Sequence, residues 1–336
     1  MDSIVTIGVI FYLLFIMYGA NQVEVGDWPI DTLRIFLYSL SVFVFLIAPF
    51  SLQALTISLN PANSELRDMI DPLQAMIVAG FALFCATFGY NLIRSEETRQ
   101  WLAGRLAAYN PESAVHMTAV LLALLVLALN MFQFVLTGGL DGVAESVEAS
   151  GISVYASLFE TVLWLVAAFL GVGFAIRRTM AATLERLGLR FPTSRDMLVG
   201  VGIGMGLFVA SMIFTAIWQS LTDPETFAQQ IRAAEGFSRQ LQTLPVILLV
   251  TGGAAIGEEI FMRGALQPIF GIGLTSAFFA LLHSQYLLTP TFGFIFLVGV
   301  SLGLVRRNVG TTAAVLAHFV YNVAPFLLAI LLGDTL

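Results

Sequence analysis

Long apolar stretches constrain this chain more than any other feature. Several of them run uninterrupted for close to the roughly 20 residues that an α-helix needs to cross a bilayer. Apolar residues make up 58% of the 336 residues and charged residues 11%, less than half of the roughly 25% in an ordinary soluble domain. No single soluble core can bury so much apolar surface. We therefore expect an integral membrane protein that crosses the lipid bilayer many times, and exclude a soluble enzyme, a nucleic-acid binder and a disordered protein.

Polar connectors with turn residues separate the apolar stretches into candidate spans. They predict an all-α fold, a polytopic membrane helix bundle of about ten transmembrane helices, eight at the fewest. The ten predicted spans are 4–20, 34–57, 74–93, 117–137, 154–176, 197–218, 244–267, 272–288, 292–305 and 311–332.

The distribution of arginines predicts the orientation of the bundle. The connectors 94–116 and 177–196 and the pair Arg306 and Arg307 are arginine-rich, and all fall on one side of a ten-span topology. Cytoplasmic loops are enriched in basic residues, so this side is predicted to be cytoplasmic and both termini to lie outside. The opposite side has only three arginines, Arg67, Arg232 and Arg239.

A run of alternating glycines lies inside the sixth predicted span, at Gly200, Gly202, Gly204 and Gly206. Its spacing is reminiscent of a nucleotide-binding loop, but such a loop follows a strand and does not lie within an apolar span. Small residues allow membrane helices to approach closely. We therefore interpret the run as a helix-packing face.

Polar groups inside spans are costly and are functional hypotheses by default. The first six spans contain few of them, namely Glu160, Asn91, Asn130 and Gln133. We interpret these four as hydrogen-bonding groups between helices or as residues at the ends of spans. The stronger candidates lie in the last four spans.

The seventh predicted span contains two adjacent carboxylates and an arginine. Glu259 and Arg263 are four residues apart, so they share a helix face and are expected to form an ion pair. Glu258 is rotated by about 100° from Glu259 because an α-helix has 3.6 residues per turn. Glu258 is therefore expected to remain unpaired and to point elsewhere.

The eighth and tenth predicted spans each contain a histidine that lies four residues from a second candidate residue. Phe279 shares a helix face with His283, and His318 shares a face with Asn322. Counted from the cytoplasmic ends of their spans, Glu258 and His283 lie about 15–18 Å deep at 1.5 Å per residue, and His318 is predicted at a similar depth. One interpretation is a structural polar network that ties helices together. The alternative is catalysis, because a carboxylate, two imidazoles and an amide suit water activation and oxyanion stabilisation.

These residues resemble the motifs of a known family. The three elements are EEIFMRG at Glu258–Gly264, Phe279 with His283, and LAHFVYN at Leu316–Asn322. In this order, on separate apolar helices, they are similar to the CPBP family, the CAAX-protease and bacteriocin-processing (ABI) intramembrane endopeptidases, which include the type II CAAX prenyl endopeptidases. The resemblance is strongest over residues 250–325 and begins near residue 184.

The resemblance implies an intramembrane endopeptidase that hydrolyses peptide bonds of membrane-associated protein or peptide substrates. By motif position, Glu258 and His283 would activate water, and His318 with Asn322 would hold the oxyanion. Glu259, Arg263 and Phe279 would support them. It also implies a catalytic module at 184–336 after an N-terminal transmembrane region, 1–183, of unassigned role. A cavity open to the cytoplasmic side, in the plasma membrane of a prokaryote, is the expected location of the reaction.

Two alternatives remain at this point. The first is a zinc-dependent form of the same hydrolase, in which Glu258, Glu259, His283 and His318 would be the metal ligands. We favour a mechanism without a cofactor, because the two histidines lie on different helices and each lies near a group suited to another task. The second is a transporter-like or immunity membrane protein without enzymatic activity, in which the polar cluster is structural. A prenylated substrate is not assumed, because the N-terminal region is longer than in the eukaryotic members.

Overall fold

The fold was analysed in a computed structural model. It describes residues 3–60, 70–106, 108–139, 142, 154–224, 227–228, 241, 243–283, 286 and 289–332. Helices dominate these residues, and one isolated parallel bridge joins Phe174 and Arg178. The all-α prediction is confirmed. Arg67, Arg232 and Arg239, the three arginines assigned to the outer side, lie outside the described residues.

Nine helical segments of the described chain are long and apolar enough to cross a membrane. Their surfaces are rich in exposed Phe, Leu, Ile and Val side chains, as expected for helices that face lipid. The protein is therefore a polytopic integral membrane protein. The segments are Thr6–Val25, Ile30–Ser58, Pro72–Arg94, Ala114–Leu136, Val154–Gly171, Ser194–Leu221, Leu244–Leu282, Pro290–Asn308 and Thr311–Leu332.

The seventh segment combines two predicted spans. It has 39 residues, about 58 Å of helix at 1.5 Å per residue, which is about twice the hydrocarbon thickness of a bilayer. It consists of α12 (Leu244–Glu259), a π-helix η1 (Ile260–Leu266) and α13 (Gln267–Leu282). Gly271 breaks it with φ 74° and ψ 175°, a conformation that glycine adopts without a steric penalty. Gly271 therefore lies between the two predicted spans 244–267 and 272–288, and the nine segments of the described chain fall within the predicted range of eight to ten.

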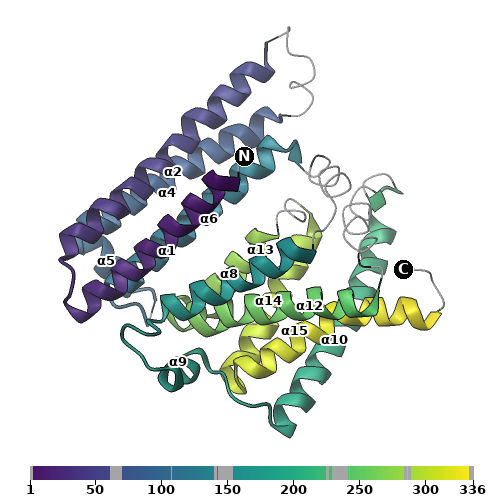
Figure 1. Cartoon of the computed structure of the whole chain (residues 1–336). Helices are drawn as coiled ribbons and strands as arrows, with labels where there is room; N and C mark the ends of the chain where they lie inside the picture. Colours follow the sequence, from purple (N-terminus) through teal and green to yellow (C-terminus); the bar gives the residue numbers. More distant parts are fainter. Residues whose placement is uncertain are drawn as a thin grey trace. The chain divides into compact units, whose positions relative to one another are not determined.

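The described chain packs into two compact units. The first consists of residues 1–139, 169–183 and 268–271. Its helices are α1 (Ser3–Val25), α2 (Ile30–Ser58), α4 (Pro72–Arg94), α5 (Glu96–Ala103) and α6 (Ala114–Leu136). Figure 1 shows α2 and α4 as a long antiparallel pair, and both pack against α6 around a core that includes Leu33, Leu37 and Leu92.

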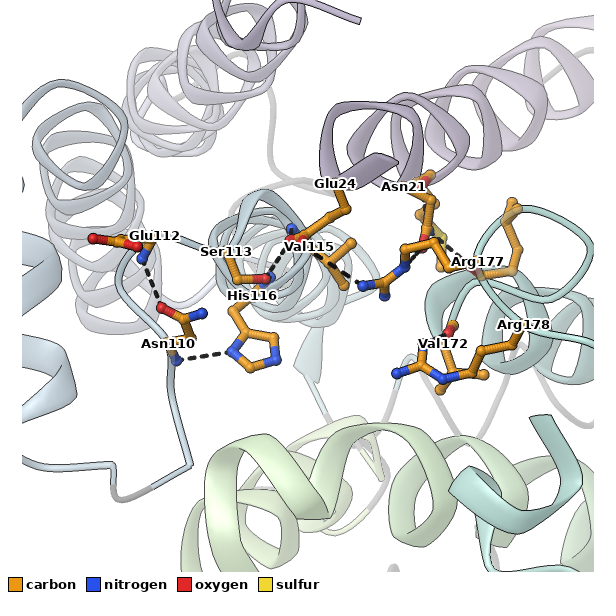
Figure 2. A network of polar contacts seen from close by, with 12 residues as sticks. Asn21, Glu24, Asn110, Glu112, Ser113, Val115, His116, Val172, Arg177 and Arg178 are labelled. Carbon is orange, nitrogen blue, oxygen red and sulfur yellow. Dashed lines mark hydrogen bonds and ion pairs between the residues drawn. The ribbon is translucent and has the colours of Figure 1, made fainter. Parts of the chain in front are cut away.

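A polar network joins three connectors of this first unit (Figure 2). The Glu24 carboxylate at the end of α1 accepts hydrogen bonds from Ser113 Oγ and from the backbone N–H of Val115 at the start of α6. It also lies 3.7 Å from Arg177 Nη1, and Arg177 Nε donates to Asn21 Oδ1 at 2.7 Å. Burial lowers the pKa of the Arg177 guanidinium, and the Glu24 carboxylate partly offsets this effect. The connector after α1, the connector before α6 and the connector after α8 therefore meet at one end of this unit.

The second unit consists of residues 140–168, 184–267 and 272–336. It contains most of α8 (Val154–Gly171) and of α9 (Met180–Leu187), together with α10 (Ser194–Leu221), α12, η1, most of α13, α14 (Pro290–Asn308) and α15 (Thr311–Leu332). Helix α15 packs against α10, α12 and α14, which makes it central to the unit.

The glycine run on α10 is a packing face on one side only. A methyl group at Gly200 would lie 2.6 Å from Leu316 Cβ, and one at Gly204 would lie 2.6 Å from the backbone oxygen of Ala317. Nothing lies within 4 Å of the equivalent positions at Gly202 and Gly206. The predicted close approach to a neighbouring helix is confirmed for Gly200 and Gly204, because they are one helical turn apart and face α15.

Candidate active site

Glu259 and Arg263 form a fully buried ion pair. Both side chains are 0% exposed, and Arg263 Nε lies 3.0 Å from Glu259 Oε2. The predicted pairing is therefore confirmed. The Arg263 guanidinium also lies 5.2 Å from the centroid of the Phe279 ring, within the range of a cation–π contact.

His318 of α15 binds the other oxygen of the same carboxylate. Its Nδ1 lies 3.0 Å from Glu259 Oε1, and the side chain is buried. Because an ionised carboxylate only accepts, Nδ1 has the hydrogen and the ring turns Nε2 away from Glu259. Glu259 thus connects Arg263 to His318 and determines how the imidazole is oriented.

His283 lies just beyond the helix that the sequence placed it on. Helix α13 ends at Leu282, and His283 follows it with φ −88° and ψ 63°. The prediction of a span that continues to residue 288 is wrong, because the backbone leaves the helical conformation at this point. The contact with Phe279 nevertheless forms, since His283 Nδ1 lies 2.8 Å from the Phe279 carbonyl oxygen. Because a carbonyl oxygen only accepts, Nδ1 donates this hydrogen bond.

The Phe279 ring contacts both histidines. Its centroid lies 4.6 Å from the ring centroid of His283 and 5.9 Å from that of His318. His283, just after α13, and His318 of α15 are therefore held against one aromatic side chain although they are far apart in the sequence. This arrangement brings five of the predicted residues into one continuous set of contacts, namely Glu259, Arg263, Phe279, His283 and His318.

Glu258 lies beside this set without a partner. The side chain is half-buried, and Oε2 makes no hydrogen bond among the described residues. Asn322 is half-buried one helical turn after His318 on α15, on the expected face. The roles assigned to these two residues stay predictions.

A π-helix follows the two glutamates and was not expected from the sequence. Residues Ile260–Leu266 form it, and most of them are buried. Arg186 of α9 donates from Nη1 to the Gly264 carbonyl oxygen at 2.9 Å. π-helical turns occur frequently at functional sites, and this one contains Arg263.

Glu160, expected to be a hydrogen-bonding group or a residue near the end of a span, lies on α8, where its carboxylate accepts a hydrogen bond from Trp164 Nε1 at 3.3 Å. Helix α8 packs against α12, since a Cβ at Gly257 would lie 3.3 Å from Trp164 Cβ. No sequence pattern could show which neighbour α8 faces.

The fold and this cluster together define a class of protein. The protein is an integral membrane protein of many helical spans, with a buried Glu–Arg–His cluster and an adjacent carboxylate whose Oε2 has no hydrogen-bond partner among the described residues. Residues 240–324 match the family model of type II CAAX prenyl endopeptidase Rce1-like proteins. This match supports the resemblance to the CPBP family over the segment that contains the cluster. No match is found among curated proteins or among solved structures.

Proposed function

We propose that this protein is an intramembrane endopeptidase that hydrolyses peptide bonds with water activated by Glu258 and His283. The observation that supports this most directly is the difference between the two adjacent carboxylates. Glu259 is bound to both Arg263 and His318, whereas Glu258 has a buried oxygen without a partner. A structural network has no use for such an unpaired acceptor, because leaving it unsatisfied costs free energy. A general base needs it.

The reaction uses the free atoms of the cluster. Glu258 accepts a proton from water as the water oxygen bonds to the peptide carbonyl carbon, and the carbonyl electron pair moves to its oxygen. When this electron pair returns, the C–N bond breaks and the proton passes to the leaving amine nitrogen. His283 is beside the water, with Nε2 as its free nitrogen.

His318 and Asn322 hold the oxyanion in this proposal. His318 already donates a hydrogen bond from Nδ1 to Glu259. To donate to an oxyanion as well, the ring therefore needs a second hydrogen on Nε2. The ring is then positively charged, and the Glu259 carboxylate balances that charge. Oxyanion donors contribute most when they are already oriented before the reaction, and the buried ion pair provides this orientation.

We further propose that no metal takes part. Zinc would require several deprotonated ligands around one ion, and the Oε1 and Oε2 atoms of Glu259 are already bound to His318 and Arg263. Among the residues that the structure describes, no three His, Cys, Asp or Glu side chains are grouped closely enough to hold a metal ion. In this proposal the histidine and glutamate side chains act directly.

The proposed orientation places the arginine-rich ends in the cytoplasm. In the second unit, a Cβ at Gly188 would lie 2.9 Å from Arg306 Cζ, so two arginine-rich connectors meet there. Positive charge on one side supports a cytoplasmic position. Single cysteines at Ser194 and Leu221, the two ends of α10, test this in a Cys85→Ser background. An impermeant reagent should label Leu221→Cys in intact cells and leave Ser194→Cys unlabelled, and the reverse pattern contradicts the topology.

Substrates are proposed to be membrane-associated proteins or peptides, since the site lies on membrane-spanning helices. The test compares new N-termini in membranes from cells that produce wild type, Glu258→Gln or Glu97→Gln. Glu97 lies on the exposed surface of α5 and serves as the control. Cleavage products should be present with wild type and Glu97→Gln and absent with Glu258→Gln. Products that persist with Glu258→Gln would contradict the assigned base.

A further inference from the structure

We propose that the segment 186–190 positions the catalytic cluster, and that Arg186 is a positioning residue of the reaction. The segment ends α9 and begins the connector to α10. This role rests on the proposed function of the cluster, and it involves residues from outside the matched segment 240–324. Hydrogen bonds from the segment 186–190 reach two elements that hold the cluster, η1 and α15.

Arg186 supplies a hydrogen-bond donor to the π-helix at a point where a proline removes one. In an α-helix the Gly264 carbonyl oxygen would accept from the backbone N–H of residue 268. That residue is Pro268, which has no N–H. Arg186 Nη1 donates to this carbonyl oxygen at 2.9 Å. Because the donor is a charged guanidinium, the bond is stronger than one from a neutral group.

The π-helix also packs directly on the backbone of the segment. A methyl group at Gly264 would lie 3.0 Å from the Leu187 carbonyl oxygen and 3.1 Å from Leu187 Cδ2. Leu187 is fully buried. Helix α9 ends at this residue, and Gly188 follows with φ 70°, which glycine adopts without a steric penalty. Because glycine has no Cβ, the backbone of η1 can approach Leu187 this closely.

The same segment binds the first turn of α15. Thr311 donates from Oγ1 to the Leu187 carbonyl oxygen and from its backbone N–H to the Gly188 carbonyl oxygen at 3.2 Å. Thr312 Oγ1 donates to the Arg190 carbonyl oxygen at 3.0 Å and lies 3.2 Å from the Arg190 backbone nitrogen. The first N–H groups of a helix have no partner within the helix. The segment satisfies one of them and anchors the start of α15.

These two anchors act on the same carboxylate. Arg263 of η1 binds Glu259 Oε2 at 3.0 Å, and His318 of α15 binds Glu259 Oε1 at 3.0 Å. His318 lies about two helical turns after Thr311, so a shift at the start of α15 moves the imidazole relative to Glu259. By holding both η1 and α15, the segment 186–190 sets the orientation of the proposed oxyanion donor. A displacement of about 1 Å at a reacting group can lower a rate on the order of 100-fold.

The kinetic test compares wild type with Arg186→Met, Arg186→Lys and the control Arg195→Met, on a peptide that contains a cleavage site found in the membrane comparison. Arg195 is exposed in the first turn of α10. Arg186→Met should lower kcat about tenfold or more and leave KM within about twofold. Arg186→Lys, which keeps a charged donor, should recover part of the loss, and Arg195→Met should match wild type. A wild-type kcat in Arg186→Met would overturn the role of Arg186, even if the melting temperature falls.

A milder substitution tests the anchor on α15. Thr311→Val removes the hydroxyl that binds the Leu187 carbonyl oxygen and leaves the backbone bond to Gly188 in place. It should fold and should lower kcat with little change in KM, because the start of α15 is less firmly held. Thr311→Ser keeps the hydroxyl and should retain the wild-type kcat. Equal kcat values for Thr311→Val and Thr311→Ser would contradict the positioning role of the segment.

A thermal-unfolding cycle tests the coupling without activity. Arg186→Met and Arg263→Ala should each lower the melting temperature, and the double variant should lose less than the sum, because both substitutions act on η1. The same cycle with Arg195→Met in place of Arg186→Met should be additive. Additive losses for Arg186→Met and Arg263→Ala would contradict the positioning role alone. A wild-type protein that cleaves no membrane substrate would contradict the proposed function, and the cycle would still decide whether Arg186 acts on the cluster.

Discussion

Replacement of Arg263 by alanine tests the buried network most directly. The substitution leaves the Glu259 carboxylate, which is 0% exposed, without the cation 3.0 Å away that compensates its charge. Removing one partner of a buried ion pair costs about 3–5 kcal/mol, because the remaining charge is neither solvated nor paired. The hydrogen bond from His318 to the same carboxylate remains, so we expect the lower part of this range.

The assay is thermal unfolding of the purified protein in one detergent, with wild type and Arg307→Ala as references. Arg307 is exposed, and its replacement is expected to change stability by no more than about 0.5 kcal/mol. Arg263→Ala should melt several degrees below both. Its double variant with Glu259→Gln should recover part of the loss, because the orphaned charge is then removed. Equal melting temperatures for Arg263→Ala and Arg307→Ala would refute the reasoning.

Three further predictions concern packing, the polar network of the first unit and metal dependence. Gly204→Leu should destabilise the protein by about 1–3 kcal/mol through overpacking against α15. Gly206→Leu should not, because nothing lies within 4 Å of a Cβ at that position. Equal thermal stability of the two variants would contradict the packing face. Arg177→Met should cost about 1.5–3 kcal/mol in thermal unfolding through the lost hydrogen bond and ion pair with charged partners, and an unchanged melting temperature would show that the network of Figure 2 contributes nothing. Exhaustive chelation should leave proteolysis intact and elemental analysis should find no stoichiometric transition metal; activity that is lost on chelation and restored by zinc would reverse the mechanism.

The sequence determined those features that depend on local spacing and composition. Apolar stretches near the length of a bilayer-spanning helix identified the spans, because backbone hydrogen bonds in a helix form within one segment. The spacing of four between Glu259 and Arg263 determined their ion pair, because residues four apart face the same side of a helix. The motif order from Glu258 to Asn322 predicted the resemblance to the protease family whose model matches residues 240–324.

The tertiary structure decided which helix faces meet and where the helices depart from regular geometry. It selected Gly200 and Gly204, and not Gly202 and Gly206, as the packing face. It ended α13 at Leu282, so that His283 lies beyond the helix.

It also packed α8 against α12 and inserted a π-helix after Glu259. Contacts between α8 and α12 join residues about one hundred positions apart, and a periodic pattern contains no information on which neighbouring helix a face will contact. The π-helical turn is likewise stabilised by its surroundings, since Arg186 binds the Gly264 carbonyl from another helix. Spacing along the chain therefore defines which residues can act together on one helix, whereas packing between helices decides which of them form the site.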